Sequence, residues 1–268
     1  MFCNVSRIVF SSCRYMHNVI IKSVVLKVMV INLKSYIRRK LARFPEIYIR
    51  VLRFKYQGTS FRRRIVDKDT EIVIEGYPRS GNSFAKRAFL SAQIIEPKIA
   101  THSHSAAQVE VAVRLKLPII VVVRNPRDAI PSFYALRKYA QRSGIKTRSL
   151  DVESEIVNYI EFNERIRALG DNVVLAIFDE VVEDFGGVVC RVNERWGTTF
   201  GVFAHSENNV KDIFENSRAH LSPNSSRIQD TVRGAQLYEK CSEDLKARAE
   251  RIFNELVVDA DRQRSVSI

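Results

Sequence analysis

From Thr70 onwards, short apolar runs alternate with stretches that have the apolar spacing of helices. The run LPIIVVV at 117–123 is apolar on both faces, as expected of a central parallel strand. Further strands are predicted at 70–76, 98–101 and 171–181. Helices are predicted at 83–93, 105–116, 126–140 and 152–169, with one more ending at Gly197. This alternation predicts an α/β, P-loop-like fold of three layers, in which helices flank a central parallel sheet.

Three features modify this pattern. Pro131 predicts a local distortion or restart within the helix at 126–140. The polar stretch 201–234 predicts an irregular region, followed by a last helix over 235–256. Residues 1–69 are expected to form a basic, helical N-terminal extension, and residues 70–268 the α/β domain.

The net charge of +13 is confined to the start of the chain. Residues 1–70 contain 16 Lys and Arg but 3 Asp and Glu, whereas the rest contains 27 of each kind. A nucleic-acid-binding domain would carry basic residues on a face of its folded part, interleaved with aromatic residues for stacking. The distribution therefore argues against nucleic acid as a partner.

The basic N-terminal segment includes an apolar run at 19–33, which Lys22 and Lys27 interrupt. The run is too short to span a bilayer. We expect a helix packed on the domain with its basic side chains in water. The alternative is a basic amphipathic helix on an anionic membrane, which would give a peripheral membrane contact through residues 1–70.

The four cysteines occur without CxxC spacing, so neither a zinc site nor a disulfide framework is predicted. This cysteine usage favours a reducing, cytoplasmic compartment, with the membrane periphery as the alternative.

The segment EGYPRSGNSF at 75–84 joins a strand to a helix through two glycines. Backbone N–H groups at such a turn bind phosphate-like anions. Gly76, Gly81 and Ser83 match the triphosphatase pattern GxxxxGK[ST], but Asn82 replaces its lysine. The loop instead contains a cation at Arg79, so we predict an anion site rather than a glycine turn with no ligand.

A second group follows the strand at 117–123. Arg124 stands at its carboxyl end, where ligands bind in open α/β sheets, and Ser132 follows on the next helix. A triphosphatase would place a magnesium-binding aspartate at such a strand end. The arginine predicts an anion met by guanidinium, and no metal is expected. A structural ion pair between Arg124 and Asp128 is the alternative.

These segments resemble the PAPS-dependent sulfotransferase family, whose donor is 3′-phosphoadenosine 5′-phosphosulfate (PAPS). YPRSGNSF resembles its 5′-phosphosulfate loop, and VVVRNPRDAIPSFY its 3′-phosphate motif. KIATHSH is similar to the segment with the catalytic histidine, and FDEVVEDFGGVVCRVNERWG to a later strand and helix. The resemblance covers roughly residues 70–200 and, through its PRSG loop, is greater to the bacterial and carbohydrate branches than to the cytosolic aryl branch.

The resemblance implies that PAPS is the sulfuryl donor and that 3′-phosphoadenosine 5′-phosphate (PAP) is the product. Backbone groups of 80–84 would hold the 5′-phosphosulfate. The side chains of Ser80, Asn82 and Ser83 would donate to it, next to Gly81. Arg79 takes the place of the family's loop lysine.

The resemblance also assigns the other end of the nucleotide. Arg124 and Ser132 would hold its 3′-phosphate, and Phe84, where the family often has tryptophan, would pack against adenine. The C-terminal Arg-Lys-Gly element of the cytosolic branch is not present in the sequence. Arg227 is the predicted substitute, with Arg233 as a second choice.

Sulfuryl transfer needs a base for the acceptor's proton and positive charge near the leaving oxygen. We expect His102 to be the base, with a pKa near the working pH, and Arg79 to stabilise the leaving oxygen. In an extended segment, His104 would point the same way as His102, which makes it the alternative base. The acceptor would be a hydroxyl or amine on a small molecule or carbohydrate.

Two other functions stay open. A P-loop nucleotide kinase or triphosphatase is disfavoured by Asn82 and Arg124. A non-catalytic partner-binding protein on the same scaffold would bind neither PAP nor, in the presence of magnesium, ATP.

Overall fold

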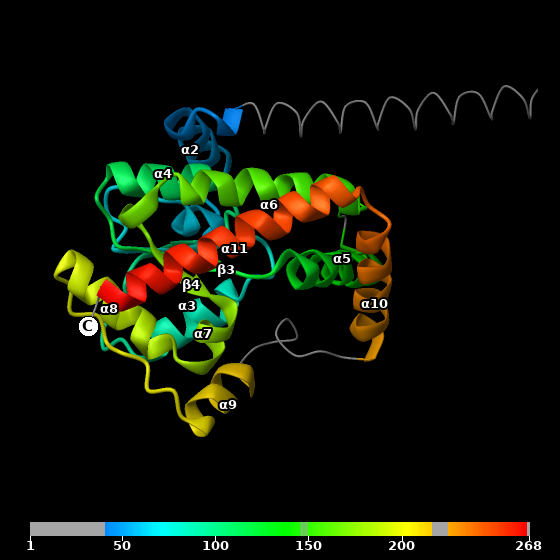
Figure 1. The fold of residues 1–268 in the computed structure, drawn as a ribbon. Helices are drawn as coiled ribbons and strands as arrows, with labels where there is room; N and C mark the ends of the chain where they lie inside the picture. Colours follow the sequence, from blue (N-terminus) through cyan, green and yellow to red (C-terminus); the bar gives the residue numbers. More distant parts are fainter. Residues whose placement is uncertain (1–40, 146, 148, 216–224, 267–268) are drawn as a thin grey trace, which may run out of the picture.

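The computed structural model describes residues 41–145, 147, 149–215 and 225–266 (Figure 1). The apolar run at 19–33 therefore lies outside the described residues. The described chain contains a sheet of order β2-β1-β3-β4, in which every neighbouring pair is parallel. Its strands are β1 (Ile72–Gly76), β2 (Ile99–Thr101), β3 (Ile119–Val123) and β4 (Val174–Ile177). The predicted α/β fold with a central parallel sheet is confirmed.

The helices follow the strands much as the apolar spacing predicts. The described helices are α2 (Pro45–Lys55), α3 (Asn82–Ser91), α4 (Ala106–Arg114), α5 (Pro126–Arg142), α6 (Val152–Arg167), α7 (Phe178–Glu183), α8 (Phe185–Trp196), α9 (Glu207–Glu215), α10 (Ser225–Glu239) and α11 (Glu243–Val266). Two short 3₁₀ helices are η1 (Ser60–Arg64) and η2 (Gly170–Asn172).

Helices surround the sheet (Figure 1), and buried side chains form two separate hydrophobic layers, one on each of its faces. Alternate strand residues such as Val73 and Val121 face a layer that includes side chains from α4, α6 and α11. Their neighbours, such as Ile74 and Ile120, face a layer formed by α3, α7 and α8. Because successive residues of a strand point to opposite faces, an entirely apolar β3 can serve both layers.

The order of the strands puts a topological switch point between β1 and β3. The chain leaves β1 through α3 on one face of the sheet and leaves β3 through α5 on the other. At such a switch point the loops after the two strands separate, and ligands of open α/β sheets bind there. The glycine loop follows β1 and Arg124 follows β3, so both lie at this edge.

Several element predictions were wrong in detail. The strand expected at 171–181 ends at Ile177, because Phe178 begins α7, whose first turn contains Asp179 and Glu180. The helix does not restart at Pro131, which lies inside α5; the local distortion predicted there stays a prediction.

The irregular region expected at 201–234 contains α9 and most of α10, and the expected last helix is divided between α10 and α11. Buried Ile213 anchors α9, and buried Tyr238 and Leu256 anchor the other two helices. These few apolar contacts are far apart in the sequence and give a weak periodic signal.

Part of the N-terminal region packs on this domain. Tyr48 and Ile49 of α2 and Ile65 and Val66 after η1 are buried in the same core as α4. The domain boundary near residue 70 stays a prediction. Within the described ranges, no helix combines the length and the apolar character needed to cross a membrane.

Candidate anion-binding and catalytic site

The loop between β1 and α3 is tightly constrained. Arg79 and Gly81 both have left-handed backbone conformations, with φ of 69° and 105°. A Cβ atom at Gly76 would lie 2.4 Å from the carbonyl oxygen of Val122 on β3. Only glycine therefore lets β1 end this close to β3 before the chain turns.

Asn82, at the position of the triphosphatase lysine, is buried at the start of α3. Its Nδ2 donates to the carbonyl oxygen of Gly76 at 3.0 Å, which closes the loop on itself. Among the described residues, Asn82 Oδ1 and the buried Ser80 Oγ have no hydrogen-bond partner. Buried polar atoms are normally satisfied, so the Ser80 hydroxyl, which can donate, is available to a polar ligand in the loop, whereas Asn82 Oδ1 can only accept a hydrogen bond.

The structure gathers three arginines around this loop. We call Arg79, Arg124 and Arg227 the arginine cluster. Arg79 Nε donates to Ser132 Oγ at 2.9 Å, and Arg124 Nη1 donates to the carbonyl oxygen of Arg79 at 3.0 Å. Burial lowers the pKa of Arg79, and the charges of Arg124 and Arg227 lower it further. Guanidinium groups stay charged in proteins, so the cluster is a region of strong positive potential.

Arg124 is held by neighbours on two helices. Its guanidinium lies 4.0 Å from the ring centroid of Phe178 on α7, and Tyr159 on α6 donates to its carbonyl oxygen at 2.7 Å. Burial lowers the pKa of Arg124, against the opposing effect of Asp128 and Asp179. The described residues show no ion pair between Arg124 and Asp128, and Arg124 Nε has no hydrogen-bond partner there. The structural ion pair considered for Arg124 is not formed.

Arg227 reaches the site from α10, although the sequence places it in a polar, irregular stretch. Its side chain is buried, with the guanidinium 5.3 Å from the ring centroid of Tyr139 on α5. Its charge acts on Arg79, so the structure brings this predicted residue to the cluster. Arg233, the second choice, is exposed.

His102 contacts the glycine-loop helix. Its Nε2 lies 3.1 Å from Ser83 Oγ, and its Nδ1 lies 2.8 Å from Thr101 Oγ1. A ring held at both nitrogens has a fixed orientation, and Thr101 can select which nitrogen carries the proton. This geometry presents His102 at the first turn of α3, beside the loop that was predicted to hold the 5′ end of the nucleotide.

Burial lowers the pKa of His102 to about 3, and the nearby charges of His104, Arg64 and Lys86 act in the same direction. The expectation of a pKa near the working pH is therefore wrong for the ligand-free protein. The imidazole is neutral at pH 7 and has a nitrogen lone pair for a proton.

His104 makes different contacts from His102. Both histidines have left-handed φ values, 58° and 50°, so the segment is not extended and the same-side argument fails. His104 Nδ1 lies 2.8 Å from the carbonyl oxygen of Gly76, and its backbone N–H donates to Glu75. These contacts join His104 to the end of β1.

Glu75 is a buried carboxylate that sequence reasoning did not identify. It accepts hydrogen bonds from the backbone of Ser103 at 2.7 Å and the side chain of Gln108 at 2.8 Å. Burial raises the pKa of Glu75, while the charge of His104 and hydrogen bonds from Ser103 and the His104 backbone act to lower it. A charged residue inside an apolar strand was the available signal. Thr101 and Phe178 had no comparable signal, since their contacts are set by the fold.

Phe84 does not offer the stacking surface expected for adenine. Its side chain is 2% exposed and packs near Phe203, His205 and Phe214. It lies on the inner side of α3, because Phe84, Ala88 and neighbouring residues face the sheet. Its backbone N–H remains part of the loop region.

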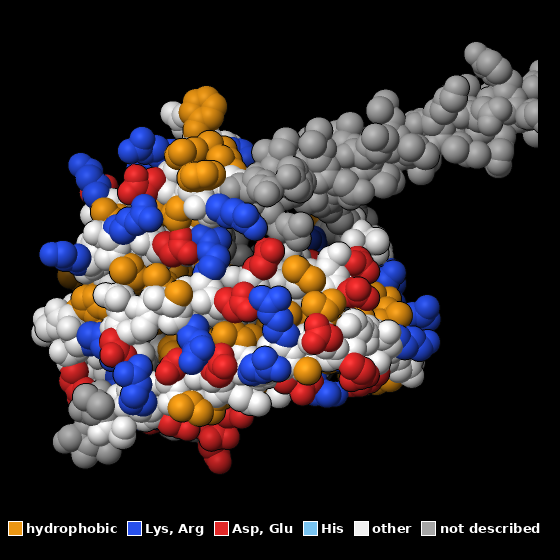
Figure 2. Space-filling view, turned by 45° about the horizontal axis from the view of Figure 1, so that its top comes forward, with side chains coloured by type: hydrophobic (Ala, Val, Ile, Leu, Met, Phe, Trp, Pro, Cys, Tyr) orange, Lys and Arg blue, Asp and Glu red, His pale blue; other side chains and the backbone are white. Residues whose placement is uncertain are grey.

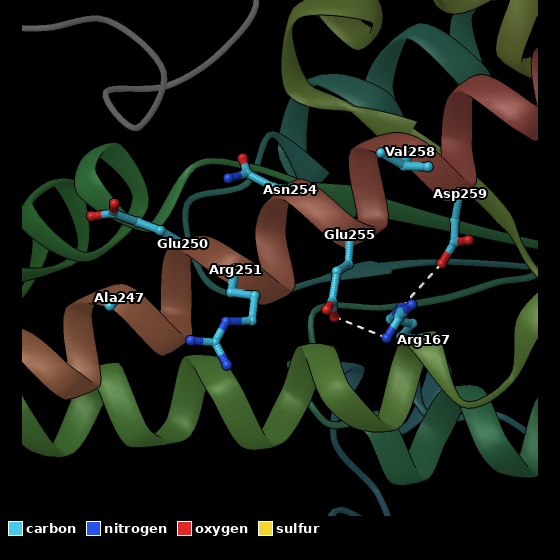
Figure 3. A pocket seen from close by; sticks show the side chains of 8 residues that line it. All are labelled: Arg167, Ala247, Glu250, Arg251, Asn254, Glu255, Val258 and Asp259. Atoms are coloured by element: carbon cyan, nitrogen blue, oxygen red, sulfur yellow. Dashed lines mark hydrogen bonds and ion pairs between the residues drawn. The ribbon is translucent and has the colours of Figure 1, made fainter.

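A hollow of about 480 Å³ on the α6 and α11 surface has a different character (Figure 3). Arg167 in this hollow pairs with Glu255 at 2.8 Å and with Asp259 at 3.2 Å. Two carboxylates thus neutralise its cation. In the part of the chain that the structure describes, no group of three or more His, Cys, Asp or Glu residues has an arrangement that could hold a metal ion.

Comparison with known proteins gives limited information. No family model matches the chain, and no curated protein matches it. Among solved structures, the crystal structure of mouse sulfotransferase SULT7A1 complexed with PAP is similar, with 13% sequence identity and a TM-score of 0.43. The match covers 75% of this chain and 88% of that chain. A likeness at this level carries no argument about function.

Proposed function

We propose that this protein transfers a sulfuryl group from PAPS to an acceptor hydroxyl or amine and leaves PAP as product. The observation that carries the proposal is the arginine cluster, which stands beside a glycine loop at the carboxyl edge of a parallel sheet. Helix N-termini and guanidinium groups together bind phosphate-type anions. The two sequence motifs that resemble sulfotransferases meet at this edge.

The residues present fit a nucleotide with anionic groups at two positions. Backbone N–H groups at the start of α3, with the hydroxyl of Ser80, would hold the 5′ end. The Nδ2 atom of Asn82, which was expected to donate to it, instead donates to Gly76 and holds the loop in shape. Arg124 and Ser132 would hold the 3′-phosphate, and the Nε atom of Arg124 supplies a donor for it. Arg227, on α10, would complete this part of the nucleotide site.

The donor supplies an activated sulfuryl group. In the transfer, a bond forms between the acceptor oxygen or nitrogen and sulfur, and the bond from sulfur to the bridging phosphate oxygen breaks. Neutral His102 accepts the acceptor's proton at Nε2 while Thr101 Oγ1 accepts a hydrogen bond from Nδ1. Arg79 stabilises the negative charge on the leaving oxygen.

The acceptor would be a small molecule or a carbohydrate. The PRSG-type loop favours the bacterial and carbohydrate branches as the relatives that this chain most resembles.

The first experiment measures nucleotide binding by calorimetry in the absence of magnesium. We expect PAP to bind, and Arg124→Ala to weaken it by about 1.5–3 kcal/mol, the range for a hydrogen bond to a charged group. 5′-AMP should be much less affected. The matched control is Arg127→Ala, since Arg127 is exposed in the first turn of α5, three residues after Arg124, and pairs with Glu239 and Glu250.

Transfer of labelled sulfate from PAPS to a panel of hydroxyl and amine acceptors then tests catalysis. Magnesium-dependent ATP binding without PAP binding would replace the proposal with a nucleotide kinase or triphosphatase. Binding of neither nucleotide would favour a non-catalytic protein.

A further inference from the structure

Helix α2 has apolar residues on two faces. One face packs on the core, where Tyr48 and Ile49 are 2% and 4% exposed. The other face is in solvent and consists of large side chains that follow one another at intervals of three, four and three positions. We call this set, with its exposed fractions, the α2 stripe: Phe44 (61%), Ile47 (51%), Val51 (46%) and Phe54 (81%).

The α2 stripe is not explained by chance exposure. Single apolar side chains are common on protein surfaces, but contiguous apolar patches mark interaction sites. The interval of three and four residues places the members of the stripe on one side of the helix, away from the core face. In Figure 2 a group of hydrophobic side chains lies at the edge of the molecule over α2, with Lys and Arg side chains nearby.

The surroundings of the stripe are basic. Arg43, Arg50 and Lys55 are exposed in or next to α2. The acidic side chain of the helix, Glu46, pairs with Arg114 of α4 at 3.0 Å. A second copy of this chain would bring like charges together across the stripe, which disfavours self-association. A negatively charged partner is complementary.

We infer that the α2 stripe rests on an anionic lipid surface. Phenylalanine and aliphatic side chains of an interfacial helix enter the boundary of the acyl region, while flanking Arg and Lys side chains contact the headgroups. The large, strongly exposed side chains form a ridge, which a deformable lipid surface accommodates without a matching groove. An acidic protein with such a groove is the competing occupant.

The contact would fix the orientation of the whole domain. Helix α2 is tied to the body of the protein by its buried face, by Glu46 with Arg114, and by Arg53, which lies 3.6 Å from Asp67. The stripe is therefore presented by a rigid platform and does not need to fold on binding. This inference is independent of the proposed function, because no member of the stripe belongs to the candidate site.

The test is sedimentation of the full chain with phosphatidylcholine vesicles, with and without phosphatidylserine. For Ile47→Ser/Phe54→Ser we expect the partition coefficient to fall about tenfold or more, as burial of an apolar side chain predicts. Arg43→Gln/Arg50→Gln should lower it roughly fivefold per residue on phosphatidylserine vesicles only. The matched control is Ile94→Ser/Ile95→Ser, since both isoleucines are strongly exposed outside α2.

Equal sedimentation of Ile47→Ser/Phe54→Ser and the unmodified protein would overturn the inference, even if other parts of the chain bind the vesicles. Binding that does not depend on phosphatidylserine would also overturn it. A second measurement uses Phe54→Trp in a Trp196→Phe background, with lipids brominated along the acyl chain. Quenching of Trp fluorescence is expected, and its absence excludes insertion. If sedimentation velocity shows that the unmodified protein is a dimer and Ile47→Ser/Phe54→Ser a monomer, a second copy of the chain covers the stripe instead.

Discussion

His102 and His104 are two residues apart, but their contacts separate their roles. His102 reaches Ser83 in the first turn of α3, whereas His104 is joined to the end of β1 through Gly76 and Glu75. A base must reach the acceptor, and in the proposed mechanism His102 has this role because it contacts the helix that follows the glycine loop. The contacts of His104 are those of a residue that holds the loop in shape.

Changing His102 to alanine should lower kcat for sulfuryl transfer by about 10²–10⁴-fold, the usual loss for a positioned base. PAP affinity should be retained, because the proposed role concerns the acceptor. His104→Ala should lose much less activity. Steady-state kinetics and calorimetry on both variants test this; an inactive His104→Ala beside an active His102→Ala would transfer the role to His104.

The lowered pKa of His102 also predicts a pH dependence of stability. In the unfolded chain this histidine takes up a proton near its ordinary pKa of 6.5, whereas in the folded protein it stays neutral down to about 3. Stability is therefore lost as the pH falls below 6.5. Between pH 7 and pH 5, the unmodified protein should lose about 2 kcal/mol more of its unfolding free energy than His102→Asn loses. Urea unfolding at both pH values measures it, and equal losses would contradict the buried, neutral state.

At the scale of elements, the sequence predicts best where a strand or helix is defined by its own residues. The apolar run of β3 and the glycine that ends α8 identify their elements locally. Helix α10 was missed because its main contacts are with α5, which is about 100 residues earlier. Only the folded chain shows that its Gly234 faces Pro131.

Helix α10 should be sensitive to a side chain at Gly234. A Cβ atom there would lie 3.0 Å from Pro131 Cα and 3.2 Å from Tyr134 Cδ1. Gly234→Val should therefore separate α10 from α5, with a loss of about 1–3 kcal/mol from overpacking. Arg227 would move away from Arg79, so PAP binding should also weaken. Thermal unfolding and calorimetry measure both effects.

The control for this change is Gln236→Val, which places the same side chain on an exposed position of α10. Unchanged PAP affinity in Gly234→Val would show that Arg227 does not contribute to the proposed nucleotide site.

At the scale of the whole molecule, one carboxylate joins three parts of the chain. Asp67 is buried and accepts from Lys98 at 2.7 Å, and it lies 3.3 Å from Arg62 and 3.6 Å from Arg53. Burial acts to raise the pKa of Asp67, but Lys98, the backbone N–H of Asp69 and the charge of Arg53 outweigh burial and lower the pKa from its ordinary value of 3.8. The group thus connects α2, η1 and the start of β2.

Asp67→Asn should destabilise the protein by about 1–2 kcal/mol at neutral pH, a loss moderated by the partial exposure of the three basic partners. Because the pKa of Asp67 is lowered on folding, its charged form stabilises the protein above pH 3.8, and this stabilisation is lost as acid protonates the folded state. The difference in unfolding free energy between Asp67→Asn and the unmodified protein should therefore narrow below that pH. Urea unfolding across this range measures it. Asp69→Asn, at an exposed position, should have little effect.

The candidate site was predictable to the extent that motifs mark it. The glycine loop, Arg79, Arg124 and the His102 segment are each visible in the sequence, and the sheet brings them to one edge. Thr101, Glu75 and Phe178 were not predicted, because their contacts with His102, the His104 segment and Arg124 depend on how strands and helices meet. The burial of Phe84, which removes the stacking surface expected for adenine, depends on packing with Phe203, His205 and Phe214.

The arginine cluster has a consequence for the amount of protein present in a cell. Like charges held close together lower the stability of the ligand-free fold, and an anion bound among them would remove that repulsion. A ligand that binds only the folded form stabilises it in proportion to RT ln(1 + [L]/Kd). Since marginally stable chains are degraded faster, the concentration of the bound anion would set how long each copy survives. Supply of the nucleotide would thus control abundance as well as turnover.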